Sequence, residues 1–287
     1  MNMSLCLHCN LFTVKGNPVN ENKYVSIFVM WLSTALRYGG LNGTDQIHLT
    51  TDIDTFEYLK TYTAFCGLMN TNTTCPTHLS LHSPPTTLRE GMAMRYMKVK
   101  YTQDVYMYCD IDVLIVKPLR PLYESLPVNT LCLHAEGLLS DSNYGAAFSA
   151  EEQAMLPSVL PGFSSGKFII CGKDLYTRFV DTVMMLQAHH SSNYYTIDQP
   201  FFNKAVYLLI KDPNQLMMIP PTFISPNGHF FNTECILLDA MGVPGDGEVH
   251  FHKILGYFTL LHSNVLEPTL LKKSLKTYEL QYNVASI

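Results

Sequence analysis

Charged residues are scarce in this 287-residue sequence, and the basic ones are not clustered. Asp, Glu, Lys and Arg together make up 15% of the chain, and the formal net charge is −5 at pH 7. Binding to nucleic acid requires lysines and arginines gathered on one surface, so we expect no nucleic-acid partner. Hydrophobic residues account for 47%, which is typical of a globular chain and excludes an intrinsically disordered one.

Long hydrophobic runs are missing as well. No apolar run approaches the roughly 20 residues that are needed to cross a bilayer, so we expect no transmembrane segment. Residues 1–12 are apolar but lack a basic leader, which argues against a secretory signal peptide. Together these two absences predict a soluble, cytoplasmic protein.

The cysteines lack the pattern of a structural zinc site. Most of the eight lie inside apolar runs, which predicts reduced and buried thiols. Cys6 and Cys9 have the spacing of metal ligands, but no second Cys-x-x-Cys follows. They also fall in a predicted strand, where this spacing places the two thiols on opposite faces. A structural role is therefore favoured over a zinc site.

An apolar stretch, residues 105–119, contains the motif Asp110-Ile-Asp112 at its centre. The runs on both sides are rich in Val, Ile and Tyr, which is typical of buried strands. An ionised carboxylate is costly to bury unpaired, so both aspartates should lie where the strand meets solvent or a cation. Side chains alternate along a strand, so the two carboxylates should point the same way. Such a pair suits a hard divalent cation, Mn²⁺ or Mg²⁺.

A second such triplet, Asp52-Ile-Asp54, precedes an amphipathic segment and is interpreted as a helix N-cap. The order of predicted elements in this half of the chain favours parallel strands joined by helices. The expected elements are a strand at 3–13, a helix at 24–38, a strand at 46–50, a helix at 56–67, a surface loop at 70–87 and a helix at 88–98.

The second half of the chain is expected to have shorter strands and a long connection. Expected strands lie at 130–134, 168–171, 216–220 and 249–252, with helices at 175–189, from 196 onward and at 267–282. Residues 136–161 are expected to be irregular because they are rich in Gly, Ser and Pro. The predicted fold is α/β, with a mixed, mainly parallel sheet flanked by helices in a single domain.

The motif at 110–112 resembles the Asp-x-Asp signature of GT-A glycosyltransferases, especially the glycogenin and galactosyltransferase-like family 8. Other motifs follow in the family's order over about residues 3–260. The resemblance implies one GT-A-type, Rossmann-like domain over 1–287. Residues 1–118 would bind a nucleotide sugar and residues 119–287 would bind the acceptor.

The resemblance also implies roles for residues that contact the donor. Tyr24 would neighbour the nucleotide base, and Arg95 would bind a phosphate or the carboxylates that hold the sugar. Ser165 and Gly166 lie in Phe163-Ser-Ser-Gly-Lys-Phe, which resembles the family's Asn-(Ala/Ser)-Gly before a strand. There the glycine allows the backbone to approach the donor sugar closely. Ser164 stands where the family has Asn.

The catalytic and third metal positions come from later motifs. Asp198 and Gln199 match the family's Asp-Gln pair, which faces the transferred sugar, and are the catalytic candidates; Asp198 can also cap the helix that follows. His250 precedes Phe251 as in the family's His-Phe and would be the third metal ligand beside Asp110 and Asp112, with His252 as its rival. Lys253 would bind the diphosphate, although the family's Pro-Trp is missing from this chain.

The function predicted by the resemblance is a hexosyltransferase that depends on Mn²⁺ or Mg²⁺. It would move a hexose from a nucleotide-diphosphate sugar, in the family a UDP-sugar, to a saccharide, protein or lipid acceptor with retention of configuration. One alternative is a Mg²⁺-dependent phosphatase of the haloacid-dehalogenase type, which also has Asp-x-Asp-Val after a strand, but residues 245–250 lack its second acidic motif. Another is an inactive GT-A-like binding protein, which the missing Pro-Trp favours.

Overall fold

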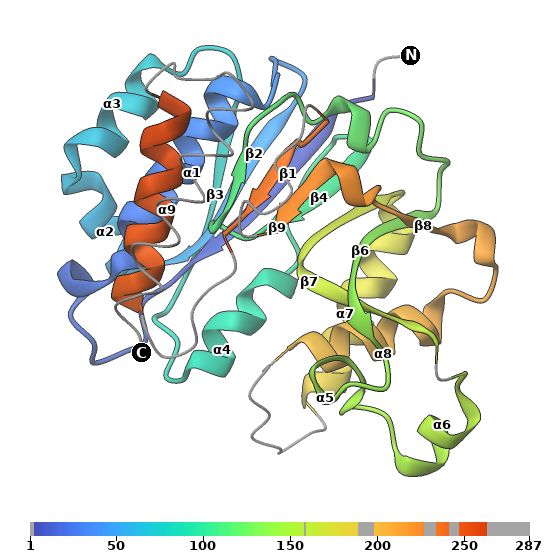
Figure 1. The fold of residues 1–287 in the computed structure, drawn as a ribbon. Coiled ribbons are helices and arrows are strands. Elements are labelled where there is room, and N and C mark those ends of the chain that lie inside the picture. The colour runs from blue at the N-terminus through green and yellow to red at the C-terminus, as the bar shows by residue number, and fades with distance from the viewer. Residues whose placement is uncertain (1–2, 158, 189–197, 227–233, 241–246, 263–287) are drawn as a thin grey trace.

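In the described part of the chain the main sheet has seven strands, and β4 lies at its middle (Figure 1). The computed structural model describes residues 3–157, 159–188, 198–226, 234–240 and 247–262. Within them the strand order is β3-β2-β1-β4-β7-β6-β8. Strands β1 to β4 are parallel, β7 is antiparallel to both of its neighbours, and β8 is parallel to β6. The strands are β1 Leu5–Leu11, β2 Gln46–Asp52, β3 Thr77–His82, β4 Val105–Cys109, β6 Thr130–Leu138, β7 Pro161–Cys171 and β8 Leu216–Met218.

Helices cover both faces of this sheet, so the predicted α/β class is confirmed. Helices α1 and α9 pack on each other and on the face that also carries a three-stranded sheet, β5-β10-β9, whereas α7 and α8 cover the opposite face. The small sheet consists of β5 Val113–Ile115, β9 Ile224–Pro226 and β10 Leu237–Asp239. The helices are α1 Lys23–Tyr38, α2 Ile53–Thr61, α3 Thr63–Thr71, α4 Leu88–Ala93, α5 Ser142–Gly145, α6 Ala150–Met155, α7 Lys173–Ala188, α8 Gln199–Leu209 and α9 Gly247–His262, with a 3-10 turn at Met94–Tyr96.

Two apolar cores lie on the two faces of the sheet, because side chains alternate along each strand. Cys9 belongs to the core under α1, whereas Cys6 belongs to the core under α7 and α8. The two thiols therefore lie on opposite faces, as their spacing predicted. All eight cysteines are free.

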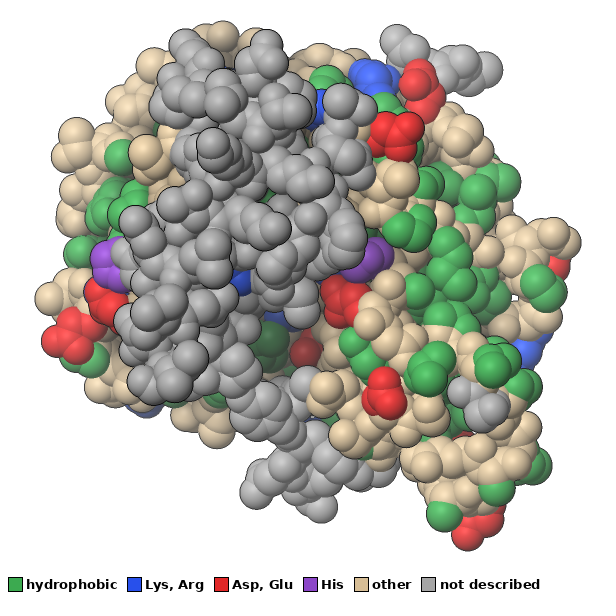
Figure 2. Space-filling model, viewed as in Figure 1, with side chains coloured by type: hydrophobic (Ala, Val, Ile, Leu, Met, Phe, Trp, Pro, Cys, Tyr) green, Lys and Arg blue, Asp and Glu red, His purple; other side chains and the backbone are tan. Residues whose placement is uncertain are grey.

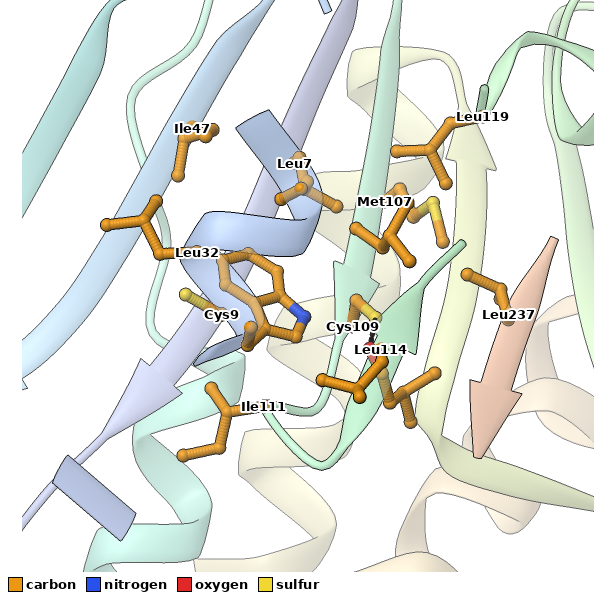
Figure 3. Packing of buried hydrophobic residues seen from close by; sticks show 14 of the residues in the cluster. Leu7, Cys9, Leu32, Ile47, Met107, Cys109, Ile111, Leu114, Leu119 and Leu237 are labelled. Atoms are coloured by element: carbon orange, nitrogen blue, oxygen red, sulfur yellow. Dashed lines mark hydrogen bonds between the residues drawn. The ribbon is translucent and has the colours of Figure 1, made fainter. Parts of the chain in front are cut away.

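The first core supports the turn between β4 and β5. Met107, Cys109, Leu114 and Leu237 pack together on this face of the sheet (Figure 3), and each is fully buried. Ile111, at the centre of the turn, is also buried in this core. The core thus anchors the residue that lies between the two aspartates of the motif.

Two predictions in the first half of the chain were wrong. Residues 70–87 contain β3, which the sequence did not reveal because an edge strand with an exposed face is as polar as a loop. The single helix expected at 56–67 is two helices, α2 and α3, separated at Tyr62, whose backbone is extended. By contrast, the prediction for Asp52 is confirmed, since its side chain caps α2 by accepting a hydrogen bond from the Thr55 amide.

The second half of the chain required further corrections. Residues 249–252 are part of α9 and not of a strand; His250, Ile254, Tyr257 and Leu261 are buried at helical spacing. The stretch 136–161 also holds the end of β6, α5 and α6, and α6 begins with a capping box formed by Ser149 and Glu152. The helix expected at 267–282 lies outside the described residues.

The described part of the chain has no helix that could span a membrane, and one face of the molecule can be inspected for basic side chains in Figure 2. No helix within the described ranges is long and apolar enough to cross a bilayer. On the face shown in Figure 2, lysine and arginine side chains are scattered singly and no basic patch is visible.

Three histidines stand side by side across β1, β2 and β3. His8 is in register with His48, and His48 is in register with His78. The inner two are buried and have uncharged partners: His8 contacts the hydroxyls of Tyr106 and Thr50, and His48 contacts that of Ser80 at 2.8 Å. Burial lowers the pKa of His8 well below its ordinary value. Burial and the neighbouring His78 lower the pKa of His48 to about 4.

We expect acid to destabilise the protein through this histidine row. Below about pH 6.5 these two histidines bind protons in the unfolded chain but not in the folded protein. The free energy of unfolding that they contribute is therefore complete above pH 6.5 and is lost as the pH falls toward 4. Urea unfolding at pH 7 and pH 4.5 should show a loss of about 2–3 kcal/mol for each of the two histidines. The variant His48→Gln should lose clearly less, and equal losses in both proteins would contradict this assignment.

Candidate active site

The site forms where β4 ends and the chain turns through residues 110–112. The Asp110 amide donates a hydrogen bond to the Gly166 carbonyl oxygen at 2.7 Å, and the Val113 amide donates to the Asp110 carbonyl oxygen at 3.1 Å. Because Ile111 is held in the core, Asp110 and Asp112 lie on the side of the turn that reaches solvent, and each is only partly buried. The sequence prediction that this motif lies at a strand end is confirmed.

Asp110 is held by groups from two elements. Its carboxylate accepts a hydrogen bond from the Tyr108 hydroxyl at 2.7 Å and pairs with the Arg95 guanidinium at 3.3 Å. Burial raises the pKa of Asp110, the positive charge of Arg95 opposes this increase, and the nearby Asp112 adds to it. A second positive charge beside Asp110 would therefore lower its pKa further and favour the ionised carboxylate.

Asp112 is paired with His250 of helix α9. The two side chains approach to 3.2 Å between Oδ2 and Nε2, and the imidazole of His250 is buried. Burial alone would raise the pKa of Asp112, but the hydrogen bond and charge of His250, together with the charge of Lys167, hold it below its ordinary value. His252, on another side of the helix, contacts Glu248 at 3.0 Å. The structure therefore brings His250, and not His252, to the motif.

Arg95 connects the motif to the start of helix α8. The buried guanidinium lies 3.4 Å from the Asp198 carboxylate and also donates to the Ser165 carbonyl oxygen at 3.3 Å. Asp198 accepts a further hydrogen bond from the Tyr96 hydroxyl at 2.7 Å. Asp198 occupies the N-cap position of α8 as predicted, but its side chain makes no capping hydrogen bond because it faces Arg95 and Tyr96.

Residues of α8 also fix the glycine-containing stretch of β7. Gln199 accepts a hydrogen bond from the Ser165 amide at 3.2 Å. Asn203 accepts from the Phe163 amide at 2.8 Å and donates to the carbonyl oxygen of the same residue at 2.9 Å. The predicted Asp198, Gln199 and Ser165 therefore lie in one hydrogen-bonded unit.

Gly166 is required beside Asp110 for steric reasons. A Cβ atom at this position would lie 2.5 Å from Oδ2 of Asp110. We expect Gly166→Ala to displace the Asp110 carboxylate while the buried strand persists, so a ligand bound by this carboxylate should lose affinity by about tenfold or more and the melting temperature should change little. Calorimetric titration with a nucleoside diphosphate as the probe would measure the loss. Ala substitution at Gly67, where a Cβ meets nothing within 4 Å, is the matched control.

A cavity of about 580 Å³ opens next to these carboxylates. It lies at the carboxyl ends of the parallel strands β1 and β4, the edge at which open α/β sheets bind ligands. Its polar lining includes Asn10, Tyr24, Arg95, Asp110 and Asp112. Burial and the charges of Asp112 and Asp110 raise the pKa of Tyr24 to about 12, so its hydroxyl stays a neutral group. Lys253 is half-buried on α9 and does not line this cavity, so its contact with a diphosphate stays a prediction.

The donor set of the site fits a hard divalent cation in chemistry. Asp110, Asp112 and His250 offer carboxylate oxygens and an imidazole nitrogen, which suit Mn²⁺ or Mg²⁺. In the described residues, however, no three such side chains are already gathered closely enough to hold an ion. Asp110 faces Tyr108 and Arg95 while Asp112 faces His250. The metal site therefore stays a prediction.

Sequence reasoning missed three charged residues that lie next to the site. Lys167 of β7 is buried and pairs with Glu136 and Asp239 at 2.6 and 2.5 Å. The signal that could have revealed it was a lysine inside an otherwise buried run, since a buried ammonium group requires partners. Nothing in the sequence alone pointed to those partners, which come from other strands.

Comparison with known proteins adds information about the fold. No protein-family model matches the sequence, and no curated protein matches it. Among solved structures it is similar to the apo glycosyltransferase GlyE of Streptococcus pneumoniae, with 13% identity and a TM-score of 0.54, over 97% of this chain and 64% of that one. It is similar to the apo bifunctional glycosyltransferase WbbM with 11% identity and a TM-score of 0.54, over 89% and 44%. Apo mouse xyloside xylosyltransferase 1 has 15% identity and a TM-score of 0.49, over 78% and 87%.

The likeness to GlyE and WbbM shows that the chain has a glycosyltransferase fold of the GT-A type. The chain spans less than two thirds of GlyE and less than half of WbbM. At such low identity the likeness concerns the fold alone, so membership of family 8 stays a prediction.

Proposed function

We propose that the protein is a metal-dependent glycosyltransferase that uses a nucleotide-diphosphate sugar as its donor. The observation that carries this proposal is the position of Asp110 and Asp112 beside a 580 Å³ cavity at the carboxyl ends of β1 and β4, with His250 against Asp112. The fold supports it, since GlyE and WbbM are glycosyltransferases. Residues 1–118 supply most of the lining, so this half would hold the nucleotide and residues 119–287 the acceptor.

The chemical problem is the charge on the departing diphosphate. Transfer breaks the bond between the anomeric carbon and a β-phosphate oxygen and forms a bond from that carbon to an acceptor hydroxyl oxygen, whose proton is released. A divalent cation held by Asp110, Asp112 and His250 would supply positive charge to the diphosphate. The protein's own contribution would be orientation, because the Arg95 guanidinium pairs with both Asp110 and Asp198 and holds the two carboxylates relative to each other.

Asp198 and Gln199 are the proposed groups next to the transferred sugar. Both belong to the hydrogen-bonded unit that fixes Ser165, so they lie beside the backbone that a donor sugar would approach. We propose a hexose donor with UDP as the carrier, transfer with retention, and a saccharide, protein or lipid as acceptor. The Asp198 carboxylate contacts Arg95 and Tyr96, which favours an orienting role for it.

Donor binding can be tested without knowledge of the acceptor. UDP, GDP and CMP should be added with and without Mn²⁺ while the melting temperature is followed, because a ligand of the native state stabilises it by mass action. We expect one nucleotide to raise the melting temperature only when the metal is present. Slow hydrolysis of the matching sugar nucleotide would then support a transferase, whereas binding without turnover would support an inactive GT-A-like protein. Release of phosphate from simple phosphomonoesters would instead support the phosphatase alternative.

His250 and His252 of α9 provide a matched pair for the metal site. His250→Ala should lower the affinity for Mn²⁺ by about tenfold or more, because a proposed ligand is lost together with its contact to Asp112. Protons compete with a metal for an imidazole, so the decline of metal binding in acid should also flatten in this variant. His252→Ala should change neither quantity, since His252 contacts Glu248 on the helix surface. Calorimetric titration with Mn²⁺ from pH 5.5 to 7.5 would measure both, and equal behaviour of the two variants would remove His250 from the site.

A further inference from the structure

Lys167 of β7 is a buried lysine. Its side chain is 2% exposed, and no other lysine in the described ranges is buried. It follows Gly166 in β7 and points to the same face as Ile169 and Cys171, which are apolar. Burying an ion pair usually gives no more stability than an apolar side chain of similar size would give. Lys167 therefore requires an explanation other than stability.

The ammonium group of Lys167 connects three strands from two sheets. It contacts Asp239 of β10 at 2.5 Å and Glu136 of β6 at 2.6 Å, and it donates to the Ser164 hydroxyl at 3.2 Å. The register of β6 against β7 shifts on both sides of Ala135, and this irregular part of β6 is where Glu136 lies. The same charge helps to keep Glu136 ionised: burial would raise the pKa of Glu136, but the hydrogen bond from His134 and the charge of Lys167 bring it to about 2.

Asp239 connects Lys167 with the backbone of Asp112, the second aspartate of the motif. Asp239 is the last residue of β10 and is paired with Val113 of β5. The next amide, that of Ala240, donates a hydrogen bond to the Asp112 carbonyl oxygen at 3.1 Å. The backbone of Asp112 is thus bound to the end of β10, and the end of β10 is bound to Lys167.

We propose that Lys167 is a positioning residue of the proposed metal site, which holds Asp112 in place through Asp239 and the end of β10. This inference rests on the proposed function. Two consecutive residues of β7 would then hold the two aspartates of the motif. The Gly166 carbonyl oxygen binds the Asp110 amide, and Lys167 holds Asp112 through Asp239. Lys167 does not touch the cavity and has no role in the reaction itself. Its effect is on the relative placement of the two carboxylates.

The test compares two variants at the position. Lys167→Met leaves Glu136 and Asp239 without their cation and is expected to be destabilised. The triple variant Lys167→Met, Glu136→Gln, Asp239→Asn removes all three charges and should recover most of the lost melting temperature. In both, we expect the affinity for Mn²⁺ in calorimetric titration to fall by about 10- to 100-fold, the range found when a partner of a metal ligand is removed. Lys204→Met, which removes a lysine of α8 that is bonded to Glu152 and to the Ala147 carbonyl oxygen, should leave that affinity unchanged.

A second measurement needs no metal. Amide hydrogen exchange at Ala240 should become faster in the triple variant relative to Tyr106 in the middle of β4, which reports on global opening. Wild-type affinity for Mn²⁺ in the triple variant, or unchanged relative exchange at Ala240, would overturn the positioning role. If the wild-type protein itself binds no Mn²⁺, the proposed metal-dependent function fails, while the exchange at Ala240 still decides whether Lys167 positions Asp112.

Discussion

Replacing both aspartates of the central motif should abolish metal-dependent donor binding. In the Asp110→Asn, Asp112→Asn variant, the increase in melting temperature caused by a nucleoside diphosphate with Mn²⁺ should disappear. Sugar transfer or donor hydrolysis should fall by at least about a thousandfold, since a metal contributes several kcal/mol to the stabilisation of a departing diphosphate. Intrinsic stability should change little, because asparagine has the same shape and both positions are only partly buried.

The other Asp-Ile-Asp triplet of the chain is the matched control. In Asp52→Asn, Asp54→Asn the cap of α2 can still form, since an asparagine oxygen accepts the same hydrogen bond from the Thr55 amide. Metal-dependent binding should therefore persist. If it survived in the variant at 110 and 112 and vanished in this one, the cation would have to lie at the end of β2 instead.

The largest loss of stability should follow from removal of Arg95. Its guanidinium is 3% exposed and lies between the carboxylates of Asp110 and Asp198, so Arg95→Met would leave two acids near each other without a cation. Breaking a buried pair in this way costs about 3–5 kcal/mol. The melting temperature should fall on the order of 10 °C in a scanning calorimeter. Arg178→Met, at an exposed position on α7, should have almost no effect.

A compensated variant separates charge from packing at this position. If Arg95→Met is combined with Asp110→Asn and Asp198→Asn, no unpaired charge remains and most of the lost stability should return. An equally low melting temperature in the combined variant would mean that the shape of Arg95, and not its charge, stabilises the junction. Arg95→Lys should be intermediate, because a lysine cannot reach both acids with a planar fork.

The sequence predicted best those features that depend on local patterns. The buried runs around residue 110 located β4 and the turn after it, and the position of Asp52 before an amphipathic segment located the cap of α2. It failed where tertiary context decides. β3 has the composition of a loop because it is an edge strand, and α9 was interpreted as a strand because a four-residue window that includes His250 is too short to distinguish the two periods.

The candidate site follows the same division. Motif order selected Asp110, Asp112, Arg95, Asp198 and Gln199, and the structure brings Arg95 between Asp110 and Asp198. Sequence alone could not choose between His250 and His252 without the helical geometry of α9, which turns them to different sides. Lys167 was overlooked because its acids come from β6 and β10, and pairing across sheets leaves no trace in local spacing.

Asp112 and His250 are in contact although 138 positions separate them in the sequence, and this separation affects when the contact can form during synthesis. Contacts between residues so far apart in the sequence form late in folding, because closing the loop between them costs conformational entropy before the contact stabilises the chain. During synthesis the strands β1, β2 and β4 are complete long before α9 leaves the ribosome and docks on α1, where Tyr38 donates to the Leu261 carbonyl oxygen at 3.0 Å. A nascent chain would therefore carry both carboxylates before the His250 imidazole reaches them. Under the proposed function, Mn²⁺ and the sugar nucleotide would stabilise only molecules in which α9 has docked, and partly folded ones would be left to chaperones and proteases.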